Sequence, residues 1–199
     1  MLLNMERVLL LCNELSEQNP TGRHCTYLKN YLSEKGIDTE TVSFSTNQQD
    51  KNVHSARPIV GANNPFNWAM LANNEMKMQG REIHEKKGFD LIHAHDWITA
   101  PAGMALAKLT EKPLIFTLHS TENNRGFCNQ HSQVVSSIEW WATFEARKVI
   151  VDNLDAYNSV KYDLNLPEHK VRLIDPMQFG WQEKVLEEYQ KAKKQAVKA

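Results

Sequence analysis

The sequence predicts an α/β domain in which a doubly wound parallel sheet forms the middle of three layers. Short apolar runs of strand type alternate with longer segments of helical periodicity along the 199 residues. Alternation of this kind favours parallel strands joined by right-handed crossover helices. The apolar runs are continuous, as expected of strands that helices cover on both faces. In such sheets ligands bind at the carboxyl ends of the strands, so the residues that follow each strand are the candidates for function.

The amino-terminal part predicts two strands, a helix and a loop. Residues 8–11 form an uninterrupted apolar run, which is typical of a buried strand. Residues 22–35 carry tyrosines and leucines at helical spacing and are followed by Gly36, a common helix end. Residues 39–44 predict the next strand, and the polar, turn-rich residues 45–64 predict a surface loop.

The middle of the chain predicts two helices with a strand between them. Pro65 suits a helix start, so we expect a helix over residues 67–87 that ends at Gly88. Residues 89–94 predict a strand, and the alanine-rich residues 99–109 predict the next helix.

The remaining residues continue the alternation to the end of the chain. Two apolar runs predict strands, a helical pattern lies between them, and a polar loop precedes that helix. One or two helical turns, a last strand and an amphipathic helix follow. In chain order these elements cover residues 114–118 (strand), 120–132 (loop), 134–148 (helix), 149–151 (strand), 160–164 (helical turns), 171–174 (strand) and 181–194 (helix).

Composition excludes several classes of protein. The formal net charge is −1 and the charged fraction is 24%, so there is no general attraction to nucleic acid or to an anionic membrane. The apolar run at residues 8–12 is far shorter than the ~20 residues of a membrane helix, and the residues before it are too polar for a secretory signal. The three cysteines form no Cys-x-x-Cys pair and predict no disulfide framework. We therefore expect a cytoplasmic protein without a membrane span or a nucleic-acid partner.

Two histidines, an aspartate and a tryptophan close the strand expected over residues 89–94. Alternation along a strand places His93 and His95 on one face, and Asp96 and Trp97 follow onto the carboxyl edge. Imidazole and carboxylate groups hydrogen-bond to hydroxyls and an indole covers apolar C–H surface, so a sugar suits this set. A metal site built on His93, His95 and Asp96 is one alternative. The other is a capped strand end, with Asp96 as the helix N-cap and Trp97 as a packing residue.

A third histidine stands at the end of the strand expected over residues 114–118. Carboxyl ends of parallel strands share one edge, so we expect His119 and His95 to lie together there. Glu122 and Arg125 follow in a polar loop and are candidates to bind a substrate sugar, phosphate or carboxylate. The alternatives are that His119 only satisfies a backbone group and that Arg125 is a solvated loop residue.

The turn before the first helix is a candidate for contact with a phosphate. Thr21 and Gly22 lie where a helix N-terminus would offer free N–H groups and the positive end of its dipole to an anion. Neither Gly-x-Gly-x-x-Gly nor a Walker motif occurs in the chain.

Together these segments resemble the amino-terminal domain of glycogen-synthase-like retaining glycosyltransferases, which implies a Rossmann-like half of the GT-B fold. The likeness extends over roughly residues 6–175 and is specific around residues 89–122. The segments that carry it are Phe89-Asp90-Leu91-Ile92-His93-Ala94-His95-Asp96-Trp97, Lys112-Pro113-Leu114-Ile115-Phe116-Thr117-Leu118-His119-Ser120-Thr121-Glu122, Ile138-Glu139-Trp140-Trp141, Glu145-Ala146, Val149-Ile150-Val151 and Leu166-Pro167-Glu168-His169-Lys170-Val171.

The resemblance predicts one half of a two-domain fold. In the family a domain that binds the nucleotide-sugar comes next, whereas this chain reads Ile174-Asp175-Pro176-Met177 and then enters residues 179–189. Those residues are similar to the family's last helix, which crosses back onto the amino-terminal domain. We therefore expect residues 1–177 to form the acceptor-side domain and residues 178–199 to form a helix that packs on it. An unrelated amphipathic helix is the alternative.

The resemblance also implies an activity and roles for residues. The family transfers a sugar from a nucleotide-sugar, its co-substrate, to a hydroxyl of a glycan or small-molecule acceptor, with retention of configuration and without a metal or other cofactor. By matched position, His95 would contact the transferred sugar or the acceptor and His119 would lie beside the donor sugar, so both are catalytic candidates. Asp96 and Trp97 would shape the pocket.

Two departures from the family pattern lie where the donor would bind. The family's Gly-Gly turn is here Pro20-Thr21-Gly22, and the Ser-rich strand end near residue 151 is here Asp152-Asn153. We therefore expect a chain that is inactive alone and that works with a partner domain or self-associates through its exposed face. The rival hypotheses are a non-catalytic glycan- or protein-binding domain and a metal-dependent hydrolase that uses His93, His95 and Asp96.

Overall fold

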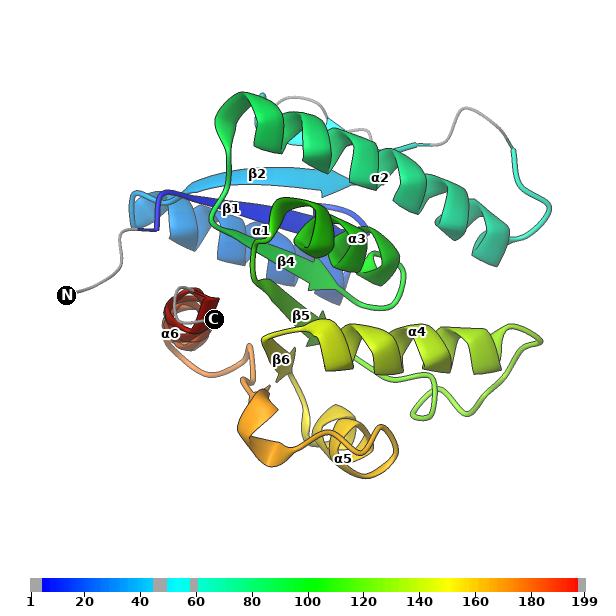
Figure 1. Ribbon diagram of the computed structural model, residues 1–199. Helices are drawn as coiled ribbons and strands as arrows, with labels where there is room; N and C mark the ends of the chain where they lie inside the picture. The colour runs from blue at the N-terminus through cyan, green and yellow to red at the C-terminus, as the bar shows by residue number, and fades with distance from the viewer. Residues whose placement is uncertain (1–4, 45–49, 58–60, 197–199) are drawn as a thin grey trace.

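Seven parallel strands form a single sheet in the computed structural model, which describes residues 5–44, 50–57 and 61–196 (Figure 1). The strand order β3-β2-β1-β4-β5-β6-β7 shows that the chain builds one side of the sheet from β1 and then returns to add β4 to β7 on the other. This topology confirms the doubly wound prediction. The strands are β1 (Arg7–Cys12), β2 (Asp38–Ser43), β3 (Val53–Ser55), β4 (Leu91–His95), β5 (Leu114–Leu118), β6 (Lys148–Val151) and β7 (Val171–Leu173).

Helices cover both faces of the sheet and complete three layers (Figure 1). Leu9 of β1 enters the core under α2, α3, α4 and α5, and Leu10 enters the core under α1 and α6, because successive strand residues point to opposite faces. None of the helices in the described part of the chain has the length and apolarity that crossing a membrane requires. The helices are α1 (Pro20–Glu34), α2 (Pro65–Lys87), α3 (Ala100–Thr110), α4 (Ser132–Glu145), α5 (Leu154–Tyr162) and α6 (Trp181–Ala196), with a 3-10 helix η1 (Glu168–Lys170) before β7.

The terminal helix α6 covers the half of one face that the other helices leave bare. Right-handed crossovers place α2 to α5 on the same face of the sheet, so α1 is the one crossover helix on the other face. α1 contacts β1 and β2, whereas α6 contacts β5 and β6. Trp181, Val185 and Tyr189 stand at helical spacing on α6 and are buried against the sheet.

Two elements differ from those that the sequence predicts. β3 lies inside the expected loop of residues 45–64, because it pairs with β2 without containing an apolar run. Residues 45–49 and 58–60 of that loop lie outside the described residues. α5 begins at Leu154, after the N-cap Asn153, rather than near residue 160, because the helix is largely polar and buries few side chains.

Two further boundaries matter for the site. β4 begins at Leu91 rather than at residue 89 and runs through His95, so His95 lies within the strand, as His93 does, rather than after it. α4 ends at Glu145, not at residue 148, because Ala146 is extended and leads directly into β6.

α3 approaches the sheet closely at Gly103. A Cβ atom at this position would lie 2.9 Å from the Cβ of Ala94 on β4 and 3.3 Å from Leu114. The Ala94 methyl is rigid, so backbone must move to accept the extra carbon.

We predict that Gly103→Ala lowers the free energy of unfolding by about 1–3 kcal/mol, measured by urea denaturation. Gly61→Ala is the matched control because no atom of the described residues lies within 4 Å of the place that its Cβ would take, and it is expected to stay within about 0.5 kcal/mol of the parent. Equal free energies of unfolding for the two variants would show that α3 leaves room for a methyl group at position 103, against the close approach to Ala94.

Candidate functional site

Four imidazole rings gather at the carboxyl edge of β4 and β5. His93 and His95 project from β4, His119 follows β5, and His24 comes from α1 on the same face. The ring centroids lie 4.1 Å apart for His93 and His95, and 5.7 Å apart for His95 and His119. His24 lies 5.5 Å from His95 and 5.0 Å from His119. We call His24, His93, His95 and His119 the histidine cluster.

His119 is the member that an incoming ligand meets first. Its side chain is 13% exposed, whereas His95 is 1% exposed and His93 is fully buried. The structure therefore brings His95 and His119 together, as the sequence predicts, but places His95 one layer below the rim rather than on it.

Two carboxylates hold His119 in place. Its Nδ1 lies 2.6 Å from Oδ2 of Asp152, and its backbone N–H donates to Oδ1 of Asp96 at 2.9 Å. Its Nε2 lies 3.5 Å from Nδ1 of His95. Asp152, His119 and His95 thus form a line that leads from the partly exposed edge into the interior.

Burial sets the charge on the cluster. Burial opposes a charge on His119, but Asp96 and the hydrogen-bonded Asp152 outweigh it and raise the pKa of His119 above its usual value. Burial lowers the pKa of His24 to about 3 and lowers the pKa values of His93 and His95 well below the usual range. His119 is therefore the ring of the cluster whose surroundings favour the imidazolium, whereas burial favours the neutral form of the other three.

The buried rings of the cluster differ in whether their nitrogens have hydrogen-bond partners among the described residues. His93 is saturated, because its Nδ1 lies 2.6 Å from the Tyr189 hydroxyl of α6 and its Nε2 lies 2.7 Å from the Thr117 hydroxyl. Both ring nitrogens of His24 and the Nε2 of His95 are buried without a hydrogen-bond partner among the described residues. Buried nitrogens of this kind are costly, and they mark His24 and His95 as the rings that remain able to bind a polar group.

The geometry does not support a metal site on His93, His95 and Asp96. No group of three or more potential ligands among the described residues is arranged to hold a metal ion. Both nitrogens of His93 are taken by Tyr189 and Thr117, and the Asp96 side chain is turned to the His119 backbone. His93, His95 and Asp96 therefore do not form a metal site.

Asp96 and Trp97 occupy the turn between β4 and α3. Asp96 has φ 58°, a left-handed conformation that directs its carboxylate to His119 instead of capping α3. The N-cap position of α3 belongs to Thr99, whose hydroxyl donates to the His95 carbonyl. Trp97 stacks on Phe66 at 6.0 Å, on the α2 side of this turn.

Glu122 and Arg125 are engaged with other protein side chains. The Arg125 guanidinium binds Glu122 at 2.8 Å and the fully buried Glu139 of α4 at 2.7 Å. Burial raises the pKa of Glu139 to about 7, against the opposing effect of Arg125. Glu122 also accepts from the Ser132 hydroxyl. These bonds anchor the loop after β5 to α4, and the structure does not bring Glu122 or Arg125 into hydrogen-bond contact with the histidine cluster.

The turn before α1 uses the N–H group that an anion would need. The Gly22 N–H donates to the Asn19 side chain at 2.6 Å, and a Cβ atom at Gly22 would lie 2.7 Å from the Ser16 carbonyl oxygen. Thr21 lies beside it in the first turn of α1. The structure thus places both residues at a helix N-terminus whose Gly22 donor is already satisfied.

Sequence reasoning missed His24, Asp152 and Tyr189. Asp152 follows β6 directly, so its place at the common carboxyl edge was a usable signal. His24 and Tyr189 lie inside helical patterns, and no local spacing relates them to β4.

The neutral rings predict an acid-sensitive fold. The unfolded chain protonates His24, His93 and His95 as the pH falls below about 6.5, whereas the folded chain resists this, for His24 down to about pH 3. Each of these histidines therefore makes its whole contribution to the free energy of unfolding above about pH 6.5. That contribution falls by about 1 kcal/mol per histidine between pH 7 and pH 5.5. The pKa of His119 is raised in the folded chain, so its contribution to the free energy of unfolding increases as the pH falls.

Urea denaturation at pH 7 and pH 5.5 tests this acid sensitivity with the variant His24→Phe. On acidification the free energy of unfolding of this variant is expected to fall by about 1 kcal/mol less than that of the parent. The exposed His169 provides the control variant His169→Phe, which should keep the full acid-induced loss. An unchanged loss in His24→Phe would contradict the description of His24 as a buried neutral ring.

Known proteins match this chain at the level of sequence and of fold. A family model described as Glycosyltransferase Family 4 matches residues 21–176. MJ1607, an uncharacterised glycosyltransferase of Methanocaldococcus jannaschii, is 30% identical over 180 residues, which is 81% of this chain and 45% of that protein. Glycogen synthase of Mycobacterium tuberculosis is 27% identical over 155 residues, which is 65% of this chain and 37% of that protein. The chain thus spans less than half the length of these curated relatives.

Solved structures agree with the fold. A chain of sucrose-phosphate synthase from Thermosynechococcus elongatus has a TM-score of 0.71 at 15% identity, covering 96% of this chain and 99% of that one. Another chain of this enzyme has a TM-score of 0.70 and is covered over 48% of its length. The chain therefore belongs to glycosyltransferase family 4 and has the fold of one half of a GT-B glycosyltransferase.

Proposed function

We propose that this domain is the acceptor-side half of a retaining glycosyltransferase, which moves a sugar from a nucleotide-sugar to a hydroxyl of a glycan or small-molecule acceptor. The observation that carries the proposal is the line of Asp152, His119 and His95 at the carboxyl edge of the sheet, in a chain of this family. This edge is where ligands bind in open α/β sheets.

In this proposal Asp152 keeps His119 charged and oriented. A charged His119 donates through Nδ1 to Asp152 and through Nε2 toward Nδ1 of His95. His95 then carries its proton on Nε2, the buried nitrogen that lacks a partner among the described residues. The fixed positive charge of His119, the partly exposed member of the cluster, suits the negative charge that develops on the departing phosphate.

Transfer requires a second half that holds the donor. Catalysis in a two-domain enzyme depends on positioning both substrates and on excluding water, and one domain supplies part of that geometry. We therefore propose that this half binds the acceptor and turns over when a donor-binding domain, in the same protein or in a partner, closes on it. Cys12 and Cys25 are buried free thiols, which supports our placement of the protein in the reducing cytoplasm.

A non-catalytic glycan-binding domain is the second candidate. The satisfied Gly22 N–H favours it, because a donor phosphate would find this group already bound to Asn19. Glycan binding without transfer in the presence of a donor half would support this candidate over the first.

The role of Asp152 can be measured without turnover. We predict that Asp152→Asn lowers the pKa of His119, followed by the NMR titration of its imidazole protons, because the variant loses the charge that stabilises the imidazolium. Asp155→Asn changes an exposed aspartate on α5 and should leave the titration unaltered. Equal His119 titration curves in the parent and in Asp152→Asn would refute this role.

Transfer itself can be assayed in trans. This chain is mixed with the separately produced carboxyl-terminal half of the M. jannaschii relative, and incorporation of labelled sugar from nucleotide-sugars into oligosaccharides is followed. We expect transfer with both halves, no transfer with either alone, and a rate about 100-fold lower for His119→Ala. His169→Ala should keep the parent rate. Absence of transfer in every combination of donor and acceptor would count against the proposal.

A further inference from the structure

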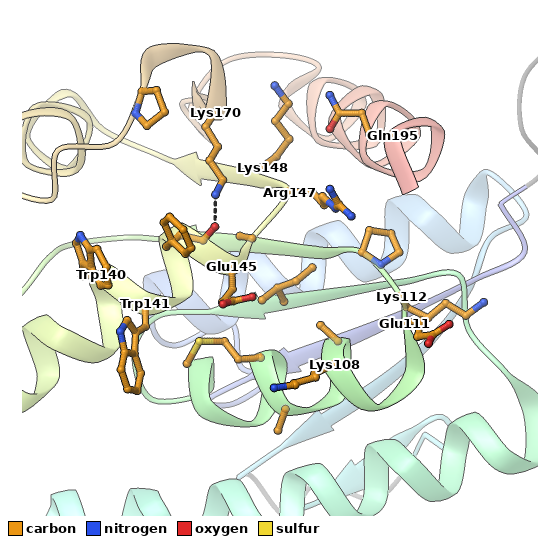
Figure 2. Close-up of a pocket in the computed structure, with 18 of the residues that line it drawn as sticks. Lys108, Glu111, Lys112, Trp140, Trp141, Glu145, Arg147, Lys148, Lys170 and Gln195 are labelled. Carbon is orange, nitrogen blue, oxygen red and sulfur yellow. Dashed lines mark hydrogen bonds between the residues drawn. The ribbon is translucent and has the colours of Figure 1, made fainter. Parts of the chain in front are cut away.

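A groove opens at the end of the sheet opposite to the histidine cluster. It lies where β5 and β6 begin, between α3, α4 and the segment around η1, and has a volume of about 1290 Å³. Figure 2 shows residues that line it. Leu114 lines the groove at the start of β5, whereas His119 follows the end of that strand. Five strand residues span roughly 16 Å, so the groove is separate from the proposed transfer site.

One wall of the groove is aromatic. Trp140, Trp141 and Phe144 belong to α4 and are 44%, 61% and 61% exposed. Figure 2 shows Trp140 and Trp141 on this helix. The rings of Trp140 and Phe144 stack with their centroids 5.6 Å apart and an angle of 13° between their planes. Three large aromatic side chains left in solvent on one helix mark a binding surface. Flat rings of this kind cover the C–H faces of sugars.

Cations line both sides of the groove. Lys108 and Lys112 lie at the end of α3, and Arg147, Lys148 and Lys170 lie across from them (Figure 2). None of the five takes part in an ion pair with a carboxylate in the part of the chain that the structure describes. The ammonium groups of Lys148 and Lys170 donate to the carbonyls of His169 and Phe144.

The acidic residues of the lining are Glu111 and Glu145, so cations outnumber carboxylates. The groove is positive although the whole chain has a formal net charge of −1. Such a local excess of positive charge attracts an anionic ligand.

We propose that this groove binds a polysaccharide strand that carries carboxylate groups. The charge excess favours an anionic ligand, the aromatic wall suits sugar rings, and cations on both sides suit a strand that lies between them. A flat bilayer would touch the exposed rims, whereas a strand can lie along the groove between the cations on its two sides. The inference that the ligand is a glycan rests on the proposed function. The inference that the ligand is negatively charged rests on the residues that line the groove.

The groove would hold a long acceptor without occupying the transfer edge. A strand bound there stays attached to the domain while its end is extended at the carboxyl edge, which raises the effective concentration of that end. The prediction for the enzyme is a preference for long acidic acceptors over short neutral ones.

Calorimetry with oligogalacturonates of about ten sugars tests the proposal on the chain as it stands. We expect binding that weakens with added salt, and at least fivefold weaker binding for malto-oligosaccharides of the same length. Trp141→Ala and Arg147→Glu should each weaken oligogalacturonate binding about tenfold, and thermal melting checks that both variants fold. Both side chains are exposed, so folding should survive.

Matched controls lie outside the groove. Phe179→Ala removes a fully exposed aromatic ring and Arg81→Ala removes an exposed cation on α2, and both should bind as the parent does. No oligogalacturonate binding, equal binding in all variants, or groove-dependent binding to anionic phosphatidylglycerol vesicles in its place would overturn the proposal.

The outcome separates this site from the proposed function. His119→Ala should bind oligogalacturonate normally, whereas Trp141→Ala should still transfer sugar to short neutral acceptors in the two-half assay. If the parent chain does not bind oligogalacturonate but the two-half assay shows transfer, the groove proposal alone is overturned. If the parent binds oligogalacturonate but no transfer occurs in the two-half assay, the transferase proposal alone is overturned.

Discussion

Right-handed crossovers leave one face of β4, β5 and β6 without a crossover helix, and α6 covers that face. Tyr189 of α6 reaches His93 through a hydrogen bond of 2.6 Å, and Trp181 packs 4.4 Å from the His24 ring. α6 therefore completes the apolar core on this face and also packs against His24 and His93 of the histidine cluster. The hydrogen bond between Tyr189 of α6 and His93 of β4 therefore links the apolar core to the candidate site.

Enclosure by α1 and α6 explains the electrostatics of the cluster. Buried imidazoles without an acidic partner remain neutral, as His24, His93 and His95 do, because charging them away from water is costly. His119 sits at the margin, where Asp96 and Asp152 compensate its charge. The same fold thus favours the neutral form of three rings and the charged form of one, and each ring lies within about 6 Å of another member of the cluster.

Much of this arrangement follows from the sequence, and the rest depends on tertiary packing. Continuous apolar runs predict the central strands, and the common edge of parallel strands predicts the meeting of His95 with His119. The burial of His95 could not be predicted, because His24 of α1 and His119 after β5 pack against it from distant parts of the chain. β3 has no apolar run to predict it. Arg125 has loop character in sequence, yet pairs with Glu139 on the next helix, a contact that only the fold creates.

At pH 6, His119 alone is expected to carry positive charge within the histidine cluster. The most direct measurement is a long-range proton–nitrogen NMR correlation on protein with ¹⁵N-labelled histidine at pH 6, which reports the protonation of each ring nitrogen. We expect His119 to show two protonated nitrogens and His24, His93 and His95 to show one each. A neutral His119, or a charged His95, would contradict the account.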